Sequence, residues 1–351
     1  MIYFSGTVIT QDGAVEGYVG LEDGMVAEVS EGICPAEPLA RGIIVPPMVN
    51  GHTHCADSDL TVPNGISLCE LVGPDGVKEK YLKESIPEKI TEGMKRFSKL
   101  AHINGIGTFI DFREGGAEGS MILRRAVPGA FILGRPSSEE FDPNELDDIL
   151  RYADGIQLSG INDVPAPYSE AVADYAVRSG KMFAIHASEG SREDIDSILA
   201  LSPSFLVHMA SAERSDLLRC ADEDVPIVSC PRSNKFFGLT PPLAMMNECN
   251  NTVILGTDNA MLCNPDMREE ARQYFSFLTD QKGGLENIWG AMVLNGRKLL
   301  YDWKRIGLRP GMDADITVLP SEDGTAGGML RSSERVLRYR QTKRVINNGF
   351  R

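Results

Sequence analysis

Residues 44–59 read "IVPPMVNGHTHCADSD". An apolar run is interrupted by Pro46 and Pro47 and then ends in His52 and His54, which have one residue between them. Residues i and i+2 of a strand point to the same side, so both imidazoles can face one ion. Histidines at a strand end also occur as ordinary polar residues, so this stretch alone leaves a metal site and a polar strand end open.

The surrounding chain alternates apolar strands with helix-length segments. Helical patterns such as "SIPEKITEGMKRFSKLAHING" and "YSEAVADYAVRSGK" separate the strands, and "GAEGSMILRRAV" is the weakest of them. Alternating strands and helices indicate βαβ units with a parallel sheet, and eight units in about 220 residues favour a (β/α)8 TIM barrel over an open sheet. The eight predicted strands are "GIIVPPMVNGH", "GTFIDF", "AFILG", "DGIQLSG", "MFAIH", "SFLVH", "VPIVSC" and "TVILGTD".

Both ends of the chain have a different, β-rich texture. "MIYFSGTVIT" and "GYVGLEDGMVAEVS" near the start, and "GMDADITVLP" and "RVLRYRQTKRVINNG" near the end, are rich in β-branched or aromatic residues. We therefore expect residues 1–45 and 306–351 to pair as a small sheet domain, with the barrel inserted as residues 46–305. The segment "GGLENIWGAMVLNGRKLLYDW" is expected to add helix.

Composition narrows the class of protein and its partners. The 351 residues are 42% apolar, and the mean hydropathy of −0.15 is ordinary for a soluble protein. A net charge of −15 disfavours nucleic acid and anionic membranes as partners. We expect no signal peptide, because the N-terminal segment lacks a basic region and a long apolar run. Seven cysteines without paired spacing indicate free thiols and a cytoplasmic location, and a homo-oligomer stays open.

Polar residues end several predicted strands. His186 ends the fifth strand in "FAIHASEG", His208 ends the sixth in "FLVHMAS", and Asp258 ends the eighth in "ILGTDNA". Barrel active sites form at the C-terminal ends of the strands, so four of the five histidines are expected at one rim. Imidazole and carboxylate suit Zn²⁺, and Fe²⁺ or Mn²⁺ less specifically. The residues alone leave the fourth histidine open between a metal ligand and a neighbour of the ligands.

Glu189 lies three residues after His186. A carboxyl group so close to a ligand can shuttle protons between water and substrate. The alternative is that Glu189 caps a helix that begins near Ser191, where the helix dipole favours a negative charge.

Five motifs in order resemble the amidohydrolase superfamily, specifically its deaminase and chlorohydrolase branch. They are "VNGHTH", "HASE", "VHMA", "CPRSNKFFGLTPP" and "LGTDNA". The closing "GMDADITVL" resembles that family's return into a small β-sandwich built from both termini. The resemblance extends over nearly the whole chain.

The resemblance implies a single catalytic metal, zinc or alternatively iron. Its ligands would be His52, His54, His186 and Asp258, and Asp258 would also accept a proton from the attacking water. His208 would orient that water or polarise the substrate, and Glu189 would be the proton shuttle. Related two-metal enzymes bridge their metals with a carboxylated lysine at the end of the fourth strand, but "DGIQLSGIND" has no lysine there.

The expected reaction is hydrolytic deamination of a small aminated heterocycle that is purine-, pyrimidine- or pterin-like. The segment "CADSDLTVPNGISLCELVGPDG" departs from the family pattern, and the chain is short for the branch, which favours a small free base. One rival is hydrolysis of a ring C–N bond in a cyclic amide or imidazolone. The other is a non-catalytic scaffold, which typically loses ligands that are all present here.

Substrate contacts are expected from residues near the same rim. Arg113 and Arg135 follow the second and third strands, and two guanidinium groups there suggest an anionic group on the substrate. The alternative is that each pairs with a carboxylate such as Glu114. Further expected contacts are Ser233, Asn234, Asn259 and Glu70; His102, Cys55 and Cys230 are expected to be structural.

Overall fold

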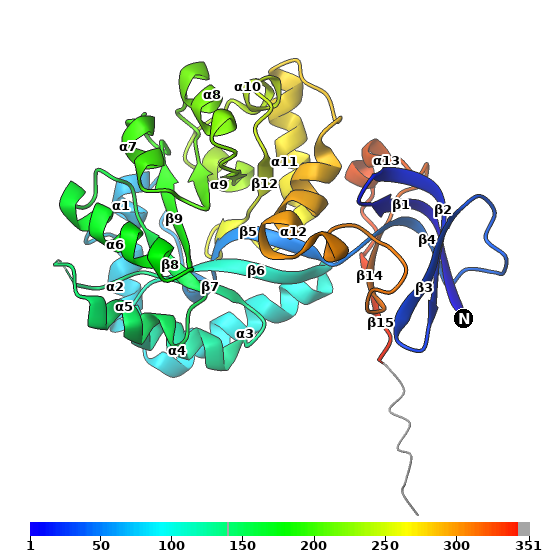
Figure 1. Ribbon diagram of the computed structural model, residues 1–351, viewed down its shortest axis with the longest axis horizontal. Coiled ribbons are helices and arrows are strands. Elements are labelled where there is room, and N and C mark those ends of the chain that lie inside the picture. Colours follow the sequence, from blue (N-terminus) through cyan, green and yellow to red (C-terminus); the bar gives the residue numbers. More distant parts are fainter. Residues whose placement is uncertain (139, 343–351) are drawn as a thin grey trace, which may run out of the picture. The chain divides into compact units, whose positions relative to one another are not determined.

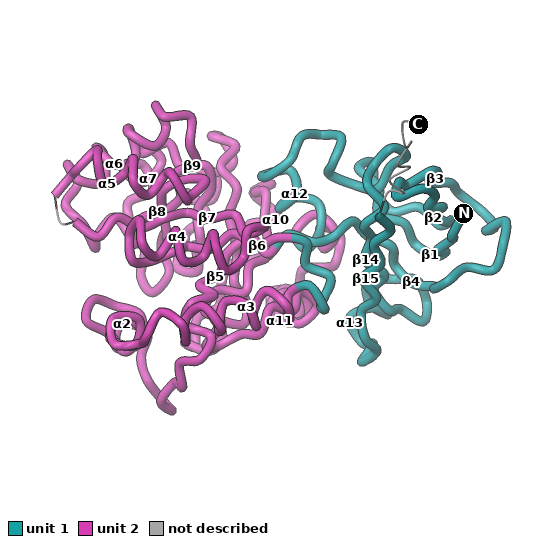
Figure 2. The backbone as a smooth tube through the Cα atoms, turned by 90° about the horizontal axis from the view of Figure 1, so that it is seen from below, with its two compact units in different colours: residues 1–49, 102–107, 292–351 teal, residues 50–101, 108–291 magenta. Residues whose placement is uncertain are grey.

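Two β-sheets organise the chain in the computed structural model, which describes residues 1–138 and 140–342 (Figure 1). The chain divides into two compact units (Figure 2). Unit 1 comprises residues 1–49, 102–107 and the described part of 292–351, and unit 2 comprises residues 50–101 and 108–291. Strands β5 and β6 begin in unit 1 and end in unit 2.

The sheet of unit 1 contains strands from both ends of the chain. Its order is β15-β14-β4-β1-β2-β3, with β1 and β4 parallel and the other pairs antiparallel. Buried Phe4, Val19, Ile44 and Ile316 belong to one apolar cluster on this sheet. The predicted strand segment 335–349 is confirmed in β15, and its part from residue 343 lies outside the described residues. The strands are β1 (Ile2–Thr10), β2 (Gly13–Glu22), β3 (Met25–Glu31), β4 (Ala40–Val45), β14 (Asp315–Leu319) and β15 (Leu337–Arg340).

The second sheet has nine strands in the order β12-β11-β10-β9-β8-β7-β6-β5-β13. The pairings from β6 to β12, and that of β13 with β5, are parallel. All eight predicted strands overlap an observed one, and the fold is mixed α/β as expected. The strands are β5 (Met48–His54), β6 (Ile106–Arg113), β7 (Phe131–Gly134), β8 (Gly155–Leu158), β9 (Met182–Ala187), β10 (Phe205–His208), β11 (Ile227–Ser229), β12 (Val253–Leu255) and β13 (Asp258–Asn259).

The two edge strands of this sheet, β12 and β13, follow each other in the sequence. Only Gly256 and Thr257 separate β12 from β13. The amide of Gly256 donates to Ser229 O at 2.9 Å on one side, and the amide of Thr257 donates to His52 O at 3.0 Å on the other. The eighth predicted strand therefore contacts both the seventh and the first.

Helices follow the strands of the large sheet along the chain (Figure 1). Side chains of Asp142, Asp194 and Asp266 accept amide protons at the starts of α5, α7 and α11, as expected for N-caps. The weak pattern at 116–127 does form a helix, over Gly116–Ala126. The helices are α3 (Pro87–Ile103), α4 (Gly116–Ala126), α5 (Pro143–Leu150), α6 (Ala166–Arg178), α7 (Ile195–Ala200), α8 (Arg214–Asp222), α9 (Pro231–Phe236), α10 (Leu243–Glu248) and α11 (Met267–Asp280).

Shorter helical elements complete the described chain. The segment expected to add helix contains a π-helical turn, Gly290–Leu294, and α12 (Asn295–Leu300). The sequence pattern gave no sign of α1 (Leu68–Val72) or α2 (Val77–Glu84), which follow the first strand of the large sheet. In the part of the chain that is described, no helix is long and apolar enough to cross a bilayer. The remaining pieces are two 3₁₀ turns, Cys55–Asp57 and Trp303–Arg305, and α13 (Ala326–Arg331).

Candidate metal centre

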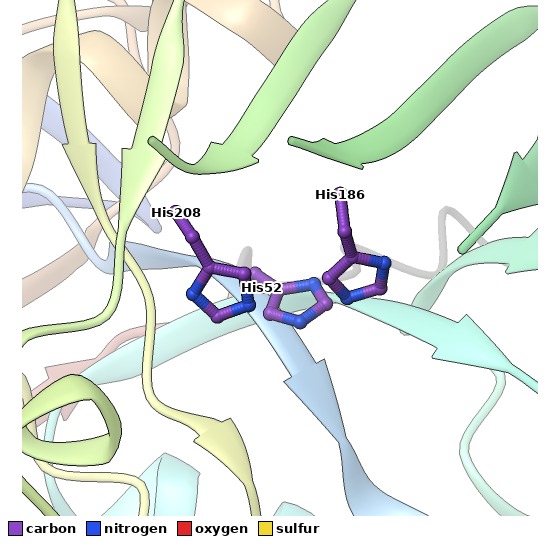
Figure 3. A group of neighbouring side chains, drawn as sticks. All are labelled: His52, His186 and His208. Atoms are coloured by element: carbon purple, nitrogen blue, oxygen red, sulfur yellow. The ribbon is translucent and has the colours of Figure 1, made fainter. Parts of the chain in front are cut away.

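Four histidines from three strands of the large sheet lie together at the C-terminal ends of those strands. His52 and His54 come from β5, His186 from β9 and His208 from β10. The ring of His52 lies between the others, with centroids 4.8 Å from His54, 5.0 Å from His186 and 5.9 Å from His208. Figure 3 shows three of these rings turned toward one another.

Carboxylates complete the cluster. Asp258 Oδ1, on β13, lies 3.3 Å from His52 Nε2 and 3.7 Å from His54 Nε2. Glu189 Oε1 lies 3.5 Å from His208 Nε2. Potential ligand atoms fall within 4.8 Å of one another inside each of three overlapping groups, so the atoms of each group are close enough to hold a cation. The groups are His52 with His186 and His208, His52 with His54 and Asp258, and Glu189 with His208 and Asp258.

His52 gives the clearest test of whether these residues fit a metal. Its side chain is fully buried, Nδ1 has no hydrogen-bond partner among the described residues, and Nε2 has only the 3.3 Å ion-pair contact with Asp258 Oδ1. A buried polar group without a partner is costly, typically about 1–3 kcal/mol. Burial lowers the pKa of His52 to about 3, so the ring is neutral at physiological pH and keeps a lone pair for a cation. The donor set fits a divalent transition metal.

The rings of His54 and His186 are oriented by their Nδ1 atoms. His54 Nδ1 lies 2.9 Å from Phe112 O and 2.8 Å from Glu114 Oε1, and both of these atoms are acceptors. His186 Nδ1 faces Leu158 O at 3.4 Å. A proton on Nδ1 leaves Nε2 of each ring with a free electron pair, which can bind a cation. Burial also lowers the pKa of His186 well below its ordinary value.

His208 has the opposite pattern. Asn234 Nδ2 donates to His208 Nδ1 at 3.3 Å, so Nδ1 is the acceptor of this ring and Nε2 carries a proton. That atom faces the carboxylate of Glu189. The geometry therefore makes His208 a hydrogen-bond donor toward the centre, in contrast to His54 and His186.

Asp258 is held as an anion by several neighbours. Ser233 Oγ donates to Asp258 Oδ2 at 2.5 Å, and Asn259 Nδ2 donates to Oδ1 at 2.9 Å. Burial alone would raise the pKa of Asp258, but the adjacent histidines, His52 foremost, hold it well below its usual range. Ser233 and Asn259, which the sequence suggested for substrate contact, thus bind a carboxylate of the centre.

Glu189 lies in the loop after β9 and takes no part in capping a helix. α7 begins at Ile195, and its cap is Asp194, so the alternative of a helix starting near Ser191 is wrong. Ser211 Oγ donates to the backbone carbonyl of Glu189 at 2.9 Å and fixes the loop. Burial raises the pKa of Glu189, so its carboxyl group binds a proton more readily than an exposed glutamate does, which suits a proton shuttle.

The backbone is in the left-handed region at several strand ends around the centre. Ser188, His208, Met209 and Asp258 have φ of 47°, 77°, 51° and 58°. Such conformations are uncommon outside glycine and concentrate at functional sites, where the surrounding structure holds them in place.

The two arginines expected at the rim point in opposite directions. Phe112 contacts the His52 ring, so Arg113, the next residue of β6, lies on the other face. A Cβ placed on Gly119 of α4 would lie 3.1 Å from Arg113 Nε, and Arg113 Nη1 is 3.5 Å from Glu114 Oε2. The expectation that Arg113 faces the site is therefore not supported. The contacts support the alternative, in which Arg113 pairs with the neighbouring carboxylate of Glu114.

Arg135 faces the site side of the sheet. A Cβ on the preceding Gly134 would touch Ile149 of α5 and Ser120 of α4, so Gly134 faces the helices and Arg135 faces away from them. Its Nε is buried and has no hydrogen-bond partner among residues 1–138 and 140–342. Its positive charge contributes to the lowered pKa of His186.

Other expected residues have structural contacts. The carboxylate of Glu70 accepts from Ser67 N at 3.0 Å in a capping box on the surface, so Glu70 is left out of the proposed site. His102 lies 2.8 Å from Arg338 Nη1, in unit 1. Cys55 and Cys230 are fully buried, and burial raises the pKa of each thiol well above its usual value, so neither is a nucleophile.

Sequence reasoning missed a polar group beside the centre. Lys78 of α2 has its Nζ 2.8 Å from Glu114 Oε1 and 3.7 Å from Asp57 Oδ2. Burial raises the pKa of Asp57 to about 7, and the positive charge of Lys78 opposes that shift. The sequence suggests Glu114 only as a partner of Arg113, and nothing in the pattern "DGVKEKYLK" distinguishes Lys78 from the neighbouring lysines.

Comparison with known proteins gives the family. The amidohydrolase family matches residues 43–349. A protein of Methanothermobacter thermautotrophicus named "Putative aminohydrolase" is 31% identical over 294 residues, covering 73% of this chain and 77% of its own. A protein of Archaeoglobus fulgidus with the same name is 32% identical over 272 residues, covering 77% of this chain and 78% of its own.

Solved structures share the fold at low identity. A zinc-bound adenosine deaminase from Xanthomonas campestris has a TM-score of 0.74 at 17% identity, covering 95% of this chain and 87% of its own. A guanine deaminase from C. acetobutylicum, with guanine in its active site, has a TM-score of 0.72 at 16% identity, covering 91% of this chain and 90% of its own. The chain belongs to the amidohydrolase family and is a hydrolase that acts on carbon–nitrogen bonds.

Proposed function

We propose that this hydrolase is a metal-dependent deaminase of a small aminated heterocycle, purine-, pyrimidine- or pterin-like, that uses water as the nucleophile. The observation that carries the proposal is the fully buried His52 ring, whose Nδ1 has no hydrogen-bond partner among the described residues, at the centre of three other histidines and Asp258. That arrangement has little purpose in a fold unless a cation occupies its centre.

The ligands in this proposal are His52, His54, His186 and Asp258. Zinc is the proposed metal and Fe²⁺ the alternative; the zinc-bound adenosine deaminase and a zinc complex of an atrazine chlorohydrolase (15% identity) support zinc. When bound, the metal supplies a Lewis acid that makes water nucleophilic near neutral pH. One metal is proposed, because β8 and the turn after it, "GIQLSGIND", contain no lysine to bridge a pair.

The chain's own residues then divide the proton transfers. Asp258, whose pKa the adjacent histidines lower and which accepts hydrogen bonds from Ser233 and Asn259, accepts a proton from the attacking water. Glu189, whose pKa is raised by burial, protonates the ring nitrogen beside the attacked carbon and regains a proton from the added hydroxyl group as the carbonyl forms. The amino group takes the proton held by Asp258 and leaves as ammonia. His208 donates from Nε2 and orients the reacting groups, and Asn234 fixes the proton of His208 in that position.

Arg135 is the proposed contact for an anionic group on the substrate. Its partly buried guanidinium faces the site and has an unpartnered Nε among the described residues. A carboxylate or phosphate would supply the missing acceptors in a charge-assisted pair.

The finer architecture belongs to the same proposal. We propose that the large sheet closes as a (β/α)8 barrel through β12 and β13, with domain limits of 46–305. Residues 1–45 and 306–351 would form the small β-sandwich. A cytoplasmic location and a homo-oligomer are proposed on the basis of free thiols and family resemblance alone.

A substrate panel tests the reaction. Zinc- and iron-loaded protein would be assayed for ammonia release from aminated purines, pyrimidines and pterins, with and without a carboxylate or phosphate group. The proposal expects ammonia with one heterocycle class and no ring-opened product. Ring opening of cyclic amides or imidazolones without ammonia release would favour the rival reaction, and no turnover of either class would reject the substrate assignment.

A further inference from the structure

A lysine from α2 is buried among polar side chains at the edge of the metal centre. Lys78 has a side chain only 8% exposed, whereas Lys83 of the same helix is 68% exposed. Its Nζ lies 2.8 Å from Glu114 Oε1 and 2.9 Å from Asn259 Oδ1. These two acceptors come from the end of β6 and from β13, so one ammonium group joins two strand ends.

Each acceptor of Lys78 is in turn bonded to a proposed ligand. Glu114 Oε1 is 2.8 Å from His54 Nδ1, and Asn259 Nδ2 donates to Asp258 Oδ1 at 2.9 Å. Lys78 is therefore one residue removed from both His54 and Asp258. These two ligands are on neighbouring strands, because β13 pairs with β5.

The hydrogen-bond directions give Lys78 a specific task. An ammonium group only donates, so Asn259 must present Oδ1 to Lys78 and its NH₂ group to Asp258. Without Lys78 the amide can turn and place its oxygen against the carboxylate, which would repel it. Similarly, Lys78 Nζ and His54 Nδ1 both lie 2.8 Å from Glu114 Oε1, so the lysine fixes the orientation of the carboxylate that accepts from His54 and leaves Nε2 of that ring for a cation.

We propose that Lys78 is a positioning residue of the metal centre, which fixes His54 through Glu114 and Asp258 through Asn259. The inference rests on the proposed function, because it takes His54 and Asp258 as ligands. It goes beyond that function by assigning part of the metal affinity to α2, a helix that contributes no ligand.

Metal binding without turnover tests the inference. Zn²⁺ affinity would be measured by competition with a chromophoric chelator, and ligand geometry by the visible spectrum of the Co²⁺-loaded protein. Lys78→Met removes the charge but keeps a long side chain, and Lys80→Met is the matched control, because Lys80 is exposed on the same helix. Loss of a residue that orients metal ligands typically weakens binding about 10- to 100-fold.

We expect Lys78→Met to weaken Zn²⁺ binding by that factor and to change the Co²⁺ spectrum, while Lys80→Met changes neither. A folded Lys78→Met protein with unchanged affinity and spectrum would overturn the inference. If Lys78→Met does not fold, Lys78→Met/Glu114→Gln/Asp57→Asn also neutralises the two carboxylates that face Lys78 Nζ, and normal affinity in that triple variant would equally overturn it. A wild-type protein that binds no metal would instead reject the proposed function itself.

Discussion

Ser233→Ala tests whether Asp258 is held as a buried anion. Ser233 and Asp258 are at most 1% exposed, and the hydroxyl donates to Oδ2 at 2.5 Å. Hydrogen bonds to charged groups contribute about 1.5–3 kcal/mol, and water cannot easily replace the lost donor at a buried site. We therefore expect the free energy of unfolding to fall by about 1.5–3 kcal/mol in metal-free protein.

Ser229→Ala is the matched control for this change. Ser229 ends β11, is also fully buried, and has an Oγ without a hydrogen-bond partner among the described residues. The same substitution there removes an unsatisfied group, so stability should stay the same or rise. Urea unfolding in EDTA measures both variants, with an unchanged slope showing that the compared states are the same. Equal stability of Ser233→Ala and Ser229→Ala would refute an ionised Asp258 that depends on Ser233.

Three further variants test other parts of the site. Gly256→Ala places a Cβ 2.8 Å from the backbone nitrogen of His52. It should lower the free energy of unfolding in urea by about 1–3 kcal/mol and weaken Zn²⁺ binding. Normal values of both would contradict this close approach. Glu189→Gln should keep metal and lower kcat about 10²- to 10⁴-fold, and a near-normal rate would remove Glu189 from the mechanism. Arg135→Met should raise KM about 10- to 100-fold for anionic substrates only, with exposed Arg125→Met as the control; an equal rise for a neutral analogue would argue against an anion contact.

The strands and the residues that end them could be predicted from local sequence. Short apolar runs bounded by polar residues mark buried parallel strands, and a polar residue at the end of such a strand lies at the active-site edge. His186 and His208 are therefore placed correctly at their strand ends without any knowledge of long-range contacts.

The direction of a side chain near a strand end was harder to predict. Arg113 and Arg135 have the same sequence context, each directly after an apolar strand, but β6 includes Arg113 whereas β7 stops at Gly134. Shifting a residue by one position moves its side chain to the other face. Only contacts such as that of Phe112 with His52 fix which face each arginine occupies.

Polar contacts between residues far apart in the sequence could not be predicted from the sequence pattern. Lys78 and Asn259 are separated by 181 positions, and their hydrogen bond depends on where a short helix docks. No periodic pattern marks α2, because a helix of eight residues offers too few turns for a clear apolar stripe. The ligands of the centre follow from strand order, whereas the residues that support them follow from tertiary packing.

The metal content of purified protein tests the central claim most directly. Elemental analysis should find about one divalent transition metal per chain in the wild-type protein, and close to none in His52→Ala. His102→Ala is the control, because His102 lies in unit 1 and should leave the content unchanged. A wild-type protein that takes up no zinc or iron, or a His52→Ala protein that retains the full amount, would contradict a metal centre built around His52.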